Sequence, residues 1–188
     1  MTEFRSLTPD RWRDLETLFG KNDASDGCWC MWFRVTRSQF GKQQGAGNKR
    51  ALKKIVTSGE IPGILAYADG QPIGWCSVAP REAFPVLDRS PVLKPVDDKP
   101  VWSIVCFFVA KPYRRQGTMD RLLRAAVDYA SAHGATTVEG YPVEPNEASI
   151  PDPFAYHGLV SAFRQAGFVE VARRSKTRPI MRYVVGEQ

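Results

Sequence analysis

The stretch FFVAKPYRRQGTMDRLLRAA, residues Phe107 to Ala126, decides how this chain is interpreted. It begins as an apolar strand, breaks at Pro112, gathers two arginines and a glycine, and continues as an amphipathic helix. The first turn of a helix presents backbone N–H groups without partners, and the helix dipole favours negative charge there. The two arginines add positive charge beside that turn. The junction therefore predicts a binding site for an anion.

The elements next to this junction have clear patterns. The helix after it places apolar residues at i, i+3, i+4, i+7, i+8 and i+11, namely Met119, Leu122, Leu123, Ala126, Val127 and Ala130. Gly134 is expected to end that helix. The run VWSIVCFFVA before the junction, residues 101–110, is almost continuously apolar. Such a strand is covered on both faces, so we place it centrally in a sheet.

The remaining patterns complete an α/β order. The elements expected in turn are helices at 9–19 and 48–57 with a mobile glycine-rich loop between them, two antiparallel strands around Asp69-Gly70, a surface excursion at 81–100, a strand within 135–141, a helix at 153–166, and two strands within 168–185. We predict a single domain over residues 1–188, of the α/β class, with a mixed sheet flanked by helices.

Composition limits the classes of partner. The chain has 188 residues and a formal net charge of +6, which suits an acidic partner such as nucleic acid, a membrane surface or a phosphorylated cofactor. Its basic residues are scattered rather than gathered in one arm or stripe, which disfavours a nucleic-acid binder. No apolar run has the length of a signal peptide or a membrane span. We expect a cytoplasmic protein that binds neither nucleic acid nor a membrane.

The cysteines do not predict a metal site or disulfides. Cys28, Cys30, Cys76 and Cys106 are far apart, and a chain of this size without a secretion signal has little need of disulfides. One Cys-x-Cys pair and two histidines do not match the usual spacing of zinc ligands. We therefore expect reduced thiols and no metal.

Two motifs resemble the GNAT superfamily, the Gcn5-related N-acetyltransferases, which bind acetyl-CoA. Arg114, Gly117 and Met119 align with its R/Q-x-x-G-x-G/A signature, and FRQAGF (163–168) matches its late Y-x-x-x-G-F segment. The order of elements also agrees from about residue 4 to residue 185. Two positions depart from the pattern: Met119 stands where Gly or Ala is preferred, and Phe163 where a tyrosine is common.

The resemblance implies that the anion is the diphosphate of CoA. Gly117 has no Cβ, so the backbone can approach a pyrophosphate closely, and successive N–H groups from Arg115 to Met119 can form an anion-binding nest. Met119 either crowds the phosphates or joins the helix core, and its spacing favours the core. In such proteins the strand that corresponds to Phe107 to Val109 splays from its neighbour and pairs through its backbone with the pantetheine arm. The residues expected to bind CoA are Phe107, Phe108, Val109, Arg114, Arg115, Gln116, Gly117, Thr118 and Met119.

The catalytic groups are less certain in the sequence, because Phe163 has no proton for the departing thiolate. Tyr156 and His157, one to two helical turns earlier, are the nearest replacement donors. The alternative is that both residues only cap or pack against a helix start. Glu139 alternates with Val138 in its strand and could relay a proton from the amine, although a salt bridge explains it equally well.

Two further features have both a purely structural interpretation and a functional one. Cys106 in its apolar strand is either an inert core thiol or a nucleophile that carries the acetyl group, and the former is the commoner situation. Trp29, Trp32 and Phe33 in CWCMWF have helical spacing and form either a buried face or, as the resemblance implies, a wall of the acceptor site. Tryptophan faces could there hold a cationic amine.

The favoured function is transfer of an acetyl group from acetyl-CoA to a primary amine of a small molecule or peptide. The alternative is a CoA-binding GNAT fold that has lost its chemistry and acts as a sensor or interaction module, which the departure at Phe163 makes worth testing. The sequence does not identify the acceptor and leaves the oligomeric state open, a homodimer included.

Overall fold

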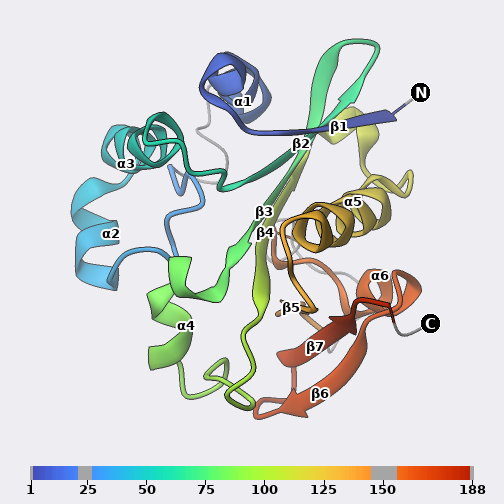
Figure 1. The fold of residues 1–188 in the computed structure, drawn as a ribbon. Coiled ribbons are helices and arrows are strands. Elements are labelled where there is room, and N and C mark those ends of the chain that lie inside the picture. The colour runs from blue at the N-terminus through green and yellow to red at the C-terminus, as the bar shows by residue number, and fades with distance from the viewer. Residues whose placement is uncertain (1, 21–26, 145–155, 187–188) are drawn as a thin grey trace.

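The computed structural model describes residues 2–20, 27–144 and 156–186, which form a seven-stranded sheet with helices on both faces (Figure 1). The strand order is β1-β2-β3-β4-β5-β7-β6, and all neighbours are antiparallel except β4 and β5. The strands are β1 (Thr2–Ser6), β2 (Gly63–Ala68), β3 (Gln71–Pro80), β4 (Trp102–Val109), β5 (Thr137–Gly140), β6 (Val169–Arg173) and β7 (Pro179–Val184). The predicted fold class and the central place of β4 are confirmed.

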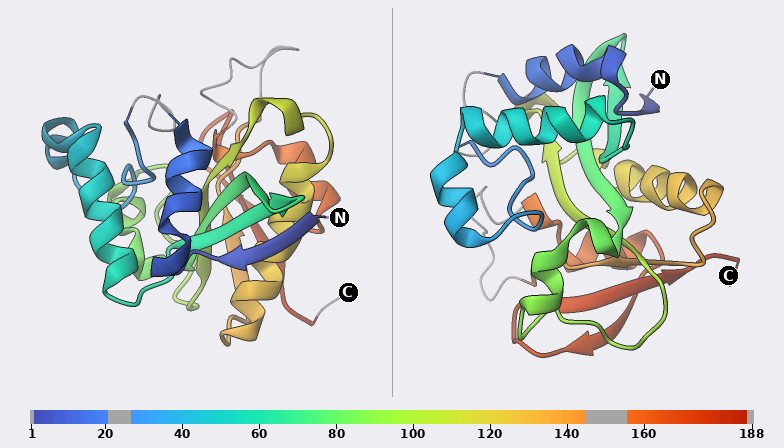
Figure 2. Two further views of the ribbon diagram at one scale, coloured as in Figure 1. Left: turned by 90° about the horizontal axis from the view of Figure 1, so that it is seen from above. Right: turned by 60° about the vertical axis from the view of Figure 1, so that its left-hand side comes forward.

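Helices cover the two faces of this sheet (Figures 1 and 2). On one face α1 (Trp12–Phe19) and α3 (Ala46–Thr57) pack against Leu65 and Trp75. On the other face α5 (Thr118–Ala132) and α6 (Val160–Gln165) pack against Ile104 and Phe107. Two short helices, α2 (Arg37–Gln43) and α4 (Pro85–Arg89), complete the α-helices among the described residues. The predicted helical spacing of α5 is confirmed, because Leu122, Leu123, Ala126 and Ala130 are fully buried.

Strands β4 and β5 separate after three paired positions. They pair in parallel only from Trp102 to Ile104, opposite Val138 to Gly140. Beyond Ile104, β4 continues to Val109 with β3 as its ladder partner, so its other backbone edge leaves the β5 ladder. The parallel pair opens into a gap at the middle of the sheet, where the candidate site lies.

A β-bulge lies at the same place in β4. Ser77 pairs with Cys106 and the next residue of β3, Val78, pairs with Ile104, so Val105 is the extra residue. A bulge bends its strand and redirects side chains. Here it allows Val105 and Cys106 to line one cavity together.

Two N-terminal expectations were wrong. The chain begins with a strand, β1, which the sequence analysis missed because its five residues alternate only between exposed and partly buried positions at a sheet edge. The segment interpreted as a glycine-rich mobile loop contains helix α2. A capping box formed by Thr36 and Gln39 starts this helix. The Thr-x-x-Gln spacing was the sequence signal that could have predicted it.

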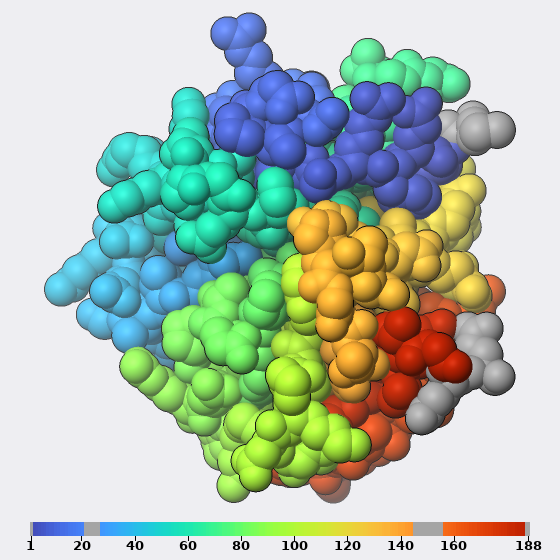
Figure 3. All heavy atoms as spheres, viewed as in Figure 1, coloured from blue at the N-terminus to red at the C-terminus, as the bar shows by residue number. Residues whose placement is uncertain are grey.

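The segment 81–100 is also not a simple surface excursion. It contains α4, and Phe84, Leu87 and Leu93 are buried in a cluster with Val105 and Tyr141. The Arg174 guanidinium donates to three backbone carbonyls of this segment, those of Val92, Lys94 and Pro95. In the space-filling view the segment, in green, lies flush against the C-terminal strands, in red (Figure 3).

The late helix is shorter than the predicted span 153–166. It begins at Val160, and residues 153–155 lie outside the described part of the chain. Leu159 forms an isolated parallel bridge with Val143, which keeps the backbone before α6 extended. Tyr156 and His157 therefore precede the helix instead of belonging to it. The Asp69-Gly70 hairpin, in contrast, is confirmed, with φ angles of 49° and 75°.

Candidate active site

The site is built around the free edge of β4 and the turn that follows this strand. Backbone φ angles in the turn are +58° at Arg115 and +72° at Gly117. Gly117 is the N-cap of the 15-residue helix α5 and holds a left-handed conformation. A Cβ added to Gly117 would meet no atom within 4 Å, so the space in front of the helix is open. Backbone N–H groups in such a turn form a concave site for an anion.

Side chains of the turn hold its backbone in place rather than covering it. Three of them donate to carbonyls of preceding residues: Arg114 Nε to Val109 at 2.9 Å, Gln116 Nε2 to Pro112 at 2.7 Å, and Thr118 Oγ1 to Tyr113 at 2.9 Å. Thr118 is buried, whereas Arg115 is exposed. Met119 packs against the core beneath α5, as its spacing predicted. The turn is therefore preorganised, and the Arg115 side chain is exposed beside it.

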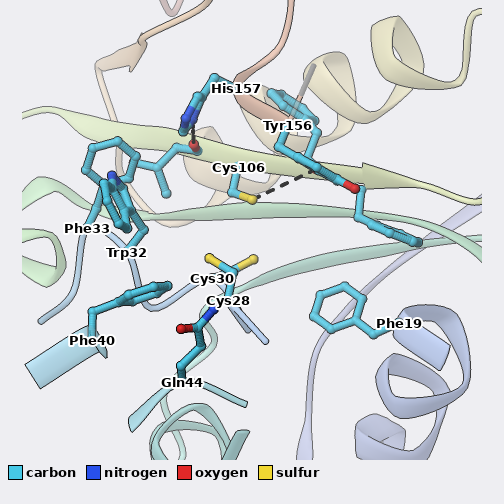
Figure 4. A pocket seen from close by; sticks show the side chains of 13 residues that line it. Phe19, Cys28, Cys30, Trp32, Phe33, Phe40, Gln44, Cys106, Tyr156 and His157 are labelled. Atoms are coloured by element: carbon cyan, nitrogen blue, oxygen red, sulfur yellow. Dashed lines mark hydrogen bonds between the residues drawn. The ribbon is translucent and has the colours of Figure 1, made fainter. Parts of the chain in front are cut away.

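A cavity of about 370 Å³ lies beside β4, on the side that faces α1, α2 and the segment 27–35 (Figure 4). Its walls are aromatic and apolar, with three thiols and few other polar groups. The lining residues are Phe19, Cys28, Cys30, Trp32, Phe33, Phe40, Gln44, Val105, Cys106, Phe107, Phe108, Tyr156 and His157. We call this cavity the cleft. A cavity of this size and character suits a small organic molecule.

The floor of the cleft carries three thiols whose sulfur atoms face one another (Figure 4). The Trp75 indole Nε1–H donates to Cys30 Sγ at 3.1 Å. Hydrogen bonding from Cys106 and from Trp75 lowers the pKa of Cys30, to which the nearby Arg34 charge contributes. Burial raises the pKa of Cys28 to about 11, and the hydrogen bond with Cys30 together with burial raises that of Cys106. At neutral pH, Cys28 and Cys106 are therefore protonated.

The segment that supplies Cys28 and Cys30 is a turn, not the helix that the spacing of Trp29, Trp32 and Phe33 indicated. Trp29 and Cys30 have φ angles of +45° and +55°, which side chains with a Cβ adopt at a cost. Trp29 is held there by a stacked contact with Trp12, at 5.8 Å between ring centroids. The turn buries Trp29 and Phe33 but leaves Trp32 38% exposed in the cleft wall.

Tyr156 and His157 line the cleft beside β4 (Figure 4). The Tyr156 ring stacks on Phe108, with centroids 6.2 Å apart. His157 Nδ1 lies 3.2 Å from the Val105 carbonyl oxygen at the free edge of β4. Because a carbonyl oxygen only accepts, Nδ1 carries the proton and Nε2 keeps its lone pair. Burial, with a contribution from the charge of Arg178, lowers the pKa of His157 to about 4, so it is neutral at pH 7.

Glu139 lies away from the cleft, in a buried ion-pair network. Its two carboxylate oxygens accept from Arg182 Nε at 2.7 Å and from Arg81 Nη1 at 3.2 Å, and the Tyr141 hydroxyl donates to it at 2.9 Å. The side chain is 1% exposed and does not line the cleft. This placement favours the salt-bridge alternative over a proton relay.

Phe163 occupies the core between the strands instead of the cleft. It is fully buried and packs on Phe107 and Phe168, with ring centroids 6.1 and 4.9 Å apart. A Cβ added to Gly140 would lie 2.0 Å from its ring, so the absence of a side chain at Gly140 is what admits the phenyl group. Phe163 is thus a core residue and offers no polar group to the cleft.

The structure brings together most of the residues predicted to form the site. Tyr156, His157, Phe107 and Phe108 line the cleft, and the turn 114–119 follows directly on β4. The sequence analysis missed Phe19, Phe40 and Gln44, which reach the cleft from α1, from α2 and from just after α2. The spacing of Phe40 and Gln44 by four residues was the available signal, but it needs helix α2 to carry meaning.

Other classes of site were searched in the described residues. There, no group of three or more His, Cys, Asp or Glu side chains is arranged to hold a metal ion. Within the same ranges, none of the helices is both long and apolar enough to cross a membrane.

Comparison with known proteins gives a clear family assignment. Residues 21–151 match the model of the acetyltransferase (GNAT) family. No curated protein matches the chain significantly. Among solved structures, a GNAT-family acetyltransferase from Streptococcus agalactiae covers 99% of this chain and 96% of its own, with a TM-score of 0.61 and 12% identity.

Two further structures support the same fold. The PaiA N-acetyltransferase from Thermoplasma acidophilum, in complex with coenzyme A, covers 98% of this chain and 99% of its own, with a TM-score of 0.55 and 15% identity. A ribosomal-protein-alanine N-acetyltransferase from Brucella melitensis covers 97% and 99%, with a TM-score of 0.56 and 16% identity. At these identities the likeness is one of fold.

Proposed function

Since the chain belongs to the GNAT acetyltransferase family, we propose that it transfers an acetyl group from acetyl-CoA to a primary amine of a small molecule or peptide. The observation that carries this proposal is the meeting of three features in one place. The anion-binding turn before α5, the free edge of β4 and the aromatic cleft adjoin one another. This arrangement can receive a diphosphate, an extended amide-bearing arm and an acceptor in that order.

In this proposal the turn binds the CoA diphosphate through backbone N–H groups. The left-handed conformation of Gly117 and the open space beside it fit this role, and Arg115 adds an exposed positive charge. Beyond Ile104 the backbone edge of β4 has left the β5 ladder, and we propose that its backbone groups between Val105 and Val109 pair with the pantetheine amides, apart from the Val105 carbonyl, which accepts from His157, and the Val109 carbonyl, which accepts from Arg114. These residues bind and orient the donor.

The cleft then receives the amine, whose nitrogen attacks the thioester carbonyl carbon. The C–N bond forms, the C–S bond breaks, and the amine must lose a proton while the thiolate leaves. His157 Nε2 keeps a lone pair and is therefore suited to accept that proton rather than to donate one. Tyr156 has a hydroxyl and is our proposed donor to the thiolate.

The alternative function, a CoA-binding module without chemistry, is favoured by one observation. Phe163 lies in the core and has no hydroxyl, so the acid common at this position in the family is absent. A thiol with a pKa of about 8.5 leaves fairly well without help, so this loss weakens catalysis without excluding it.

The two functions separate in one experiment. Calorimetry measures the affinity for CoA, and a thiol-trapping dye measures CoA release from acetyl-CoA with a panel of aromatic amines, alkylamines, polyamines and peptide N-termini. Amine-dependent release of thiol, with acetylated product found by mass spectrometry, supports the transferase. Tight CoA binding without release for any amine would instead identify a binding module.

A further inference from the structure

The part of the cleft wall that the described residues form offers an occupant little formal charge. In the described part of the chain its wall holds no Asp, Glu, Lys or Arg. His157, with a pKa lowered to about 4 by burial, is neutral at pH 7, and so are the thiols of Cys28 and Cys106. The remaining polar groups are the Gln44 amide, the Tyr156 hydroxyl and the sulfur of Cys30, whose thiolate form is favoured by hydrogen bonds from Cys106 and Trp75 and by the charge of Arg34. An ammonium ion would meet no carboxylate on this wall.

The charges that act on the cleft from behind its wall are positive. The guanidinium of Arg34 stabilises the thiolate form of Cys30, and that of Arg178 disfavours protonation of His157. Both guanidinium groups keep a buried Nε without a hydrogen-bond partner. Glu60 offsets part of the Arg34 charge. A cation in the cleft would therefore lose its water and also be repelled.

The tryptophans near the cleft already carry cations of the protein itself. Arg37 lies over the Trp32 ring, 5.5 Å from its centroid, and Lys49 lies over Trp29 at 5.1 Å. Trp32 also meets Phe40 edge to face at 5.0 Å. A ring face that binds one cation is not available for a second, so the faces covered by Arg37 and Lys49 cannot contribute to a cage for an ammonium group.

We infer that the acceptor is an aromatic amine that is uncharged at neutral pH, bound with its ring among Trp32, Phe33 and Phe40. This inference rests on the proposed acetyltransferase function. An alkylamine with a pKa of about 10 is neutral in only about one molecule per thousand at pH 7, so its use requires a base or a carboxylate. The lone pair of an arylamine is delocalised into the ring, which keeps the nitrogen unprotonated. A cleft without a strong base can use such an amine directly.

Two isomers of one composition test the inference, 4-methylaniline and benzylamine. Both fit the same volume, but benzylamine is an ammonium ion at pH 7. We expect the wild-type protein to bind 4-methylaniline at least 10-fold more tightly in the presence of CoA, as measured by calorimetry at pH 7. Raising the pH to 9 should strengthen benzylamine binding at least 10-fold and leave that of 4-methylaniline unchanged.

An isosteric variant tests the electrostatic cause. Gln44→Glu places one carboxylate on the wall and should move the ratio of the two dissociation constants at least 10-fold in favour of benzylamine. Gln39→Glu is the matched control, because Gln39 lies outside the cleft and a glutamate at this position preserves the capping box of α2. This control should leave the ratio unchanged.

Each contrary result has a distinct meaning. Tighter binding of benzylamine or spermidine than of 4-methylaniline by the wild type at pH 7 would overturn the inference, and so would a ratio unaffected by Gln44→Glu in a folded protein. Faster turnover with hexanoyl-CoA than with acetyl-CoA, without preference for 4-methylaniline, would assign the cleft to the acyl group and also overturn it. If no amine is acetylated, the proposed transferase function fails, and the binding ratio still decides which ligand the cleft accepts.

Discussion

The proposed donor turn and the proposed acceptor cleft are built from different parts of the chain. The donor turn uses the backbone of one short stretch, in which Gly117 and Arg115 set the chain direction and α5 supplies the dipole. The cleft uses side chains from α1, α2, β4 and the segments around Cys28 and Tyr156. Backbone groups bind a constant ligand without regard to side-chain identity, whereas side chains can change with the acceptor. Specificity therefore belongs to the cleft.

The largest expected effect would break the donor turn and spare the cleft. Gly117→Glu places a carboxylate where the CoA diphosphate is proposed to bind, at a residue whose φ of +72° already disfavours a side chain. Repulsion between such charges at about 4 Å is worth roughly 4 kcal/mol near a protein surface. We expect the dissociation constant of CoA to rise about 10²- to 10³-fold in calorimetric titration.

The other end of the same helix provides the control. Gly134 has a φ of +86° and also has no atom within 4 Å of an added Cβ. Gly134→Glu therefore introduces the same strain and the same charge far from the N-terminus of α5. It should leave CoA affinity within about twofold of the wild type. Equal losses in the two variants would show that strain or net charge, and not the turn, controls binding.

The next prediction concerns Glu139, which the sequence analysis considered either as a proton relay or as part of a salt bridge. Its pairs with Arg81 and Arg182 are buried, so Glu139→Gln removes one counter-charge from each guanidinium group and leaves Arg81 with Asp88 and Arg182 with Asp97. Removing one partner of a buried pair costs about 3–5 kcal/mol, and the remaining carboxylates place the expected cost at or below the lower end of this range. We expect a clear fall in the urea midpoint, while kcat at 15 °C stays within about threefold of the wild type. A large loss of kcat in a fully folded variant would restore the relay role.

The same contrast explains how much the sequence could predict. The turn before α5 was predictable because all of its determinants lie within one stretch: a strand, a glycine, two arginines and an amphipathic helix. The hairpin at Asp69-Gly70 was predictable for the same local reason. The separation of β4 from β5 was implied only by the resemblance to the family, because its position depends on where β5 ends and on a bulge at Val105 that no local pattern marks.

The cleft was only partly predictable. Trp32 and Phe33 were correctly singled out as candidates for the cleft wall. The helix that their spacing indicated is absent at this place, because the left-handed φ values at Trp29 and Cys30 are stabilised by packing with distant residues. The short helix α2 buries none of its residues completely, so its periodicity is weak and only its capping box identifies it. Side chains assembled from distant segments leave no common signature in the sequence.

A smaller effect is expected where the cleft meets the departing thiol. Tyr156→Phe removes the hydroxyl proposed to protonate the thiolate but keeps the ring that stacks on Phe108. Loss of a general acid costs about 10²-fold in rate, so kcat should fall by about that factor. The affinity for CoA should not change. A value of kcat within a few-fold of the wild type on a genuine acceptor would mean that the thiolate leaves unassisted or through water.

The smallest expected effect concerns His157. This residue connects β4 with the cleft, because it donates to the Val105 carbonyl and also lines the cleft. Burial lowers its pKa in the folded protein to about 4, against about 6.5 for the unfolded chain. Between these values the unfolded chain binds more protons, so the stability that His157 contributes is complete above pH 6.5 and is lost as the pH falls towards 4. From pH 7 to pH 5 the loss amounts to at most about 2 kcal/mol.

The variant His157→Gln removes this titration and keeps an N–H group that can donate to the Val105 carbonyl. Since about 1 kcal/mol shifts the Tm of a protein of this size by roughly 2–4 °C, lowering the pH from 7 to 5 should reduce the Tm of the wild type by about 4 °C more than that of the variant. His133, the other histidine, is present in both proteins, so its contribution cancels. Equal decreases in Tm would show that His157 is protonated in the folded protein at pH 5. In that case the cleft tolerates a buried cation, and its preference for uncharged amines would lose its electrostatic basis.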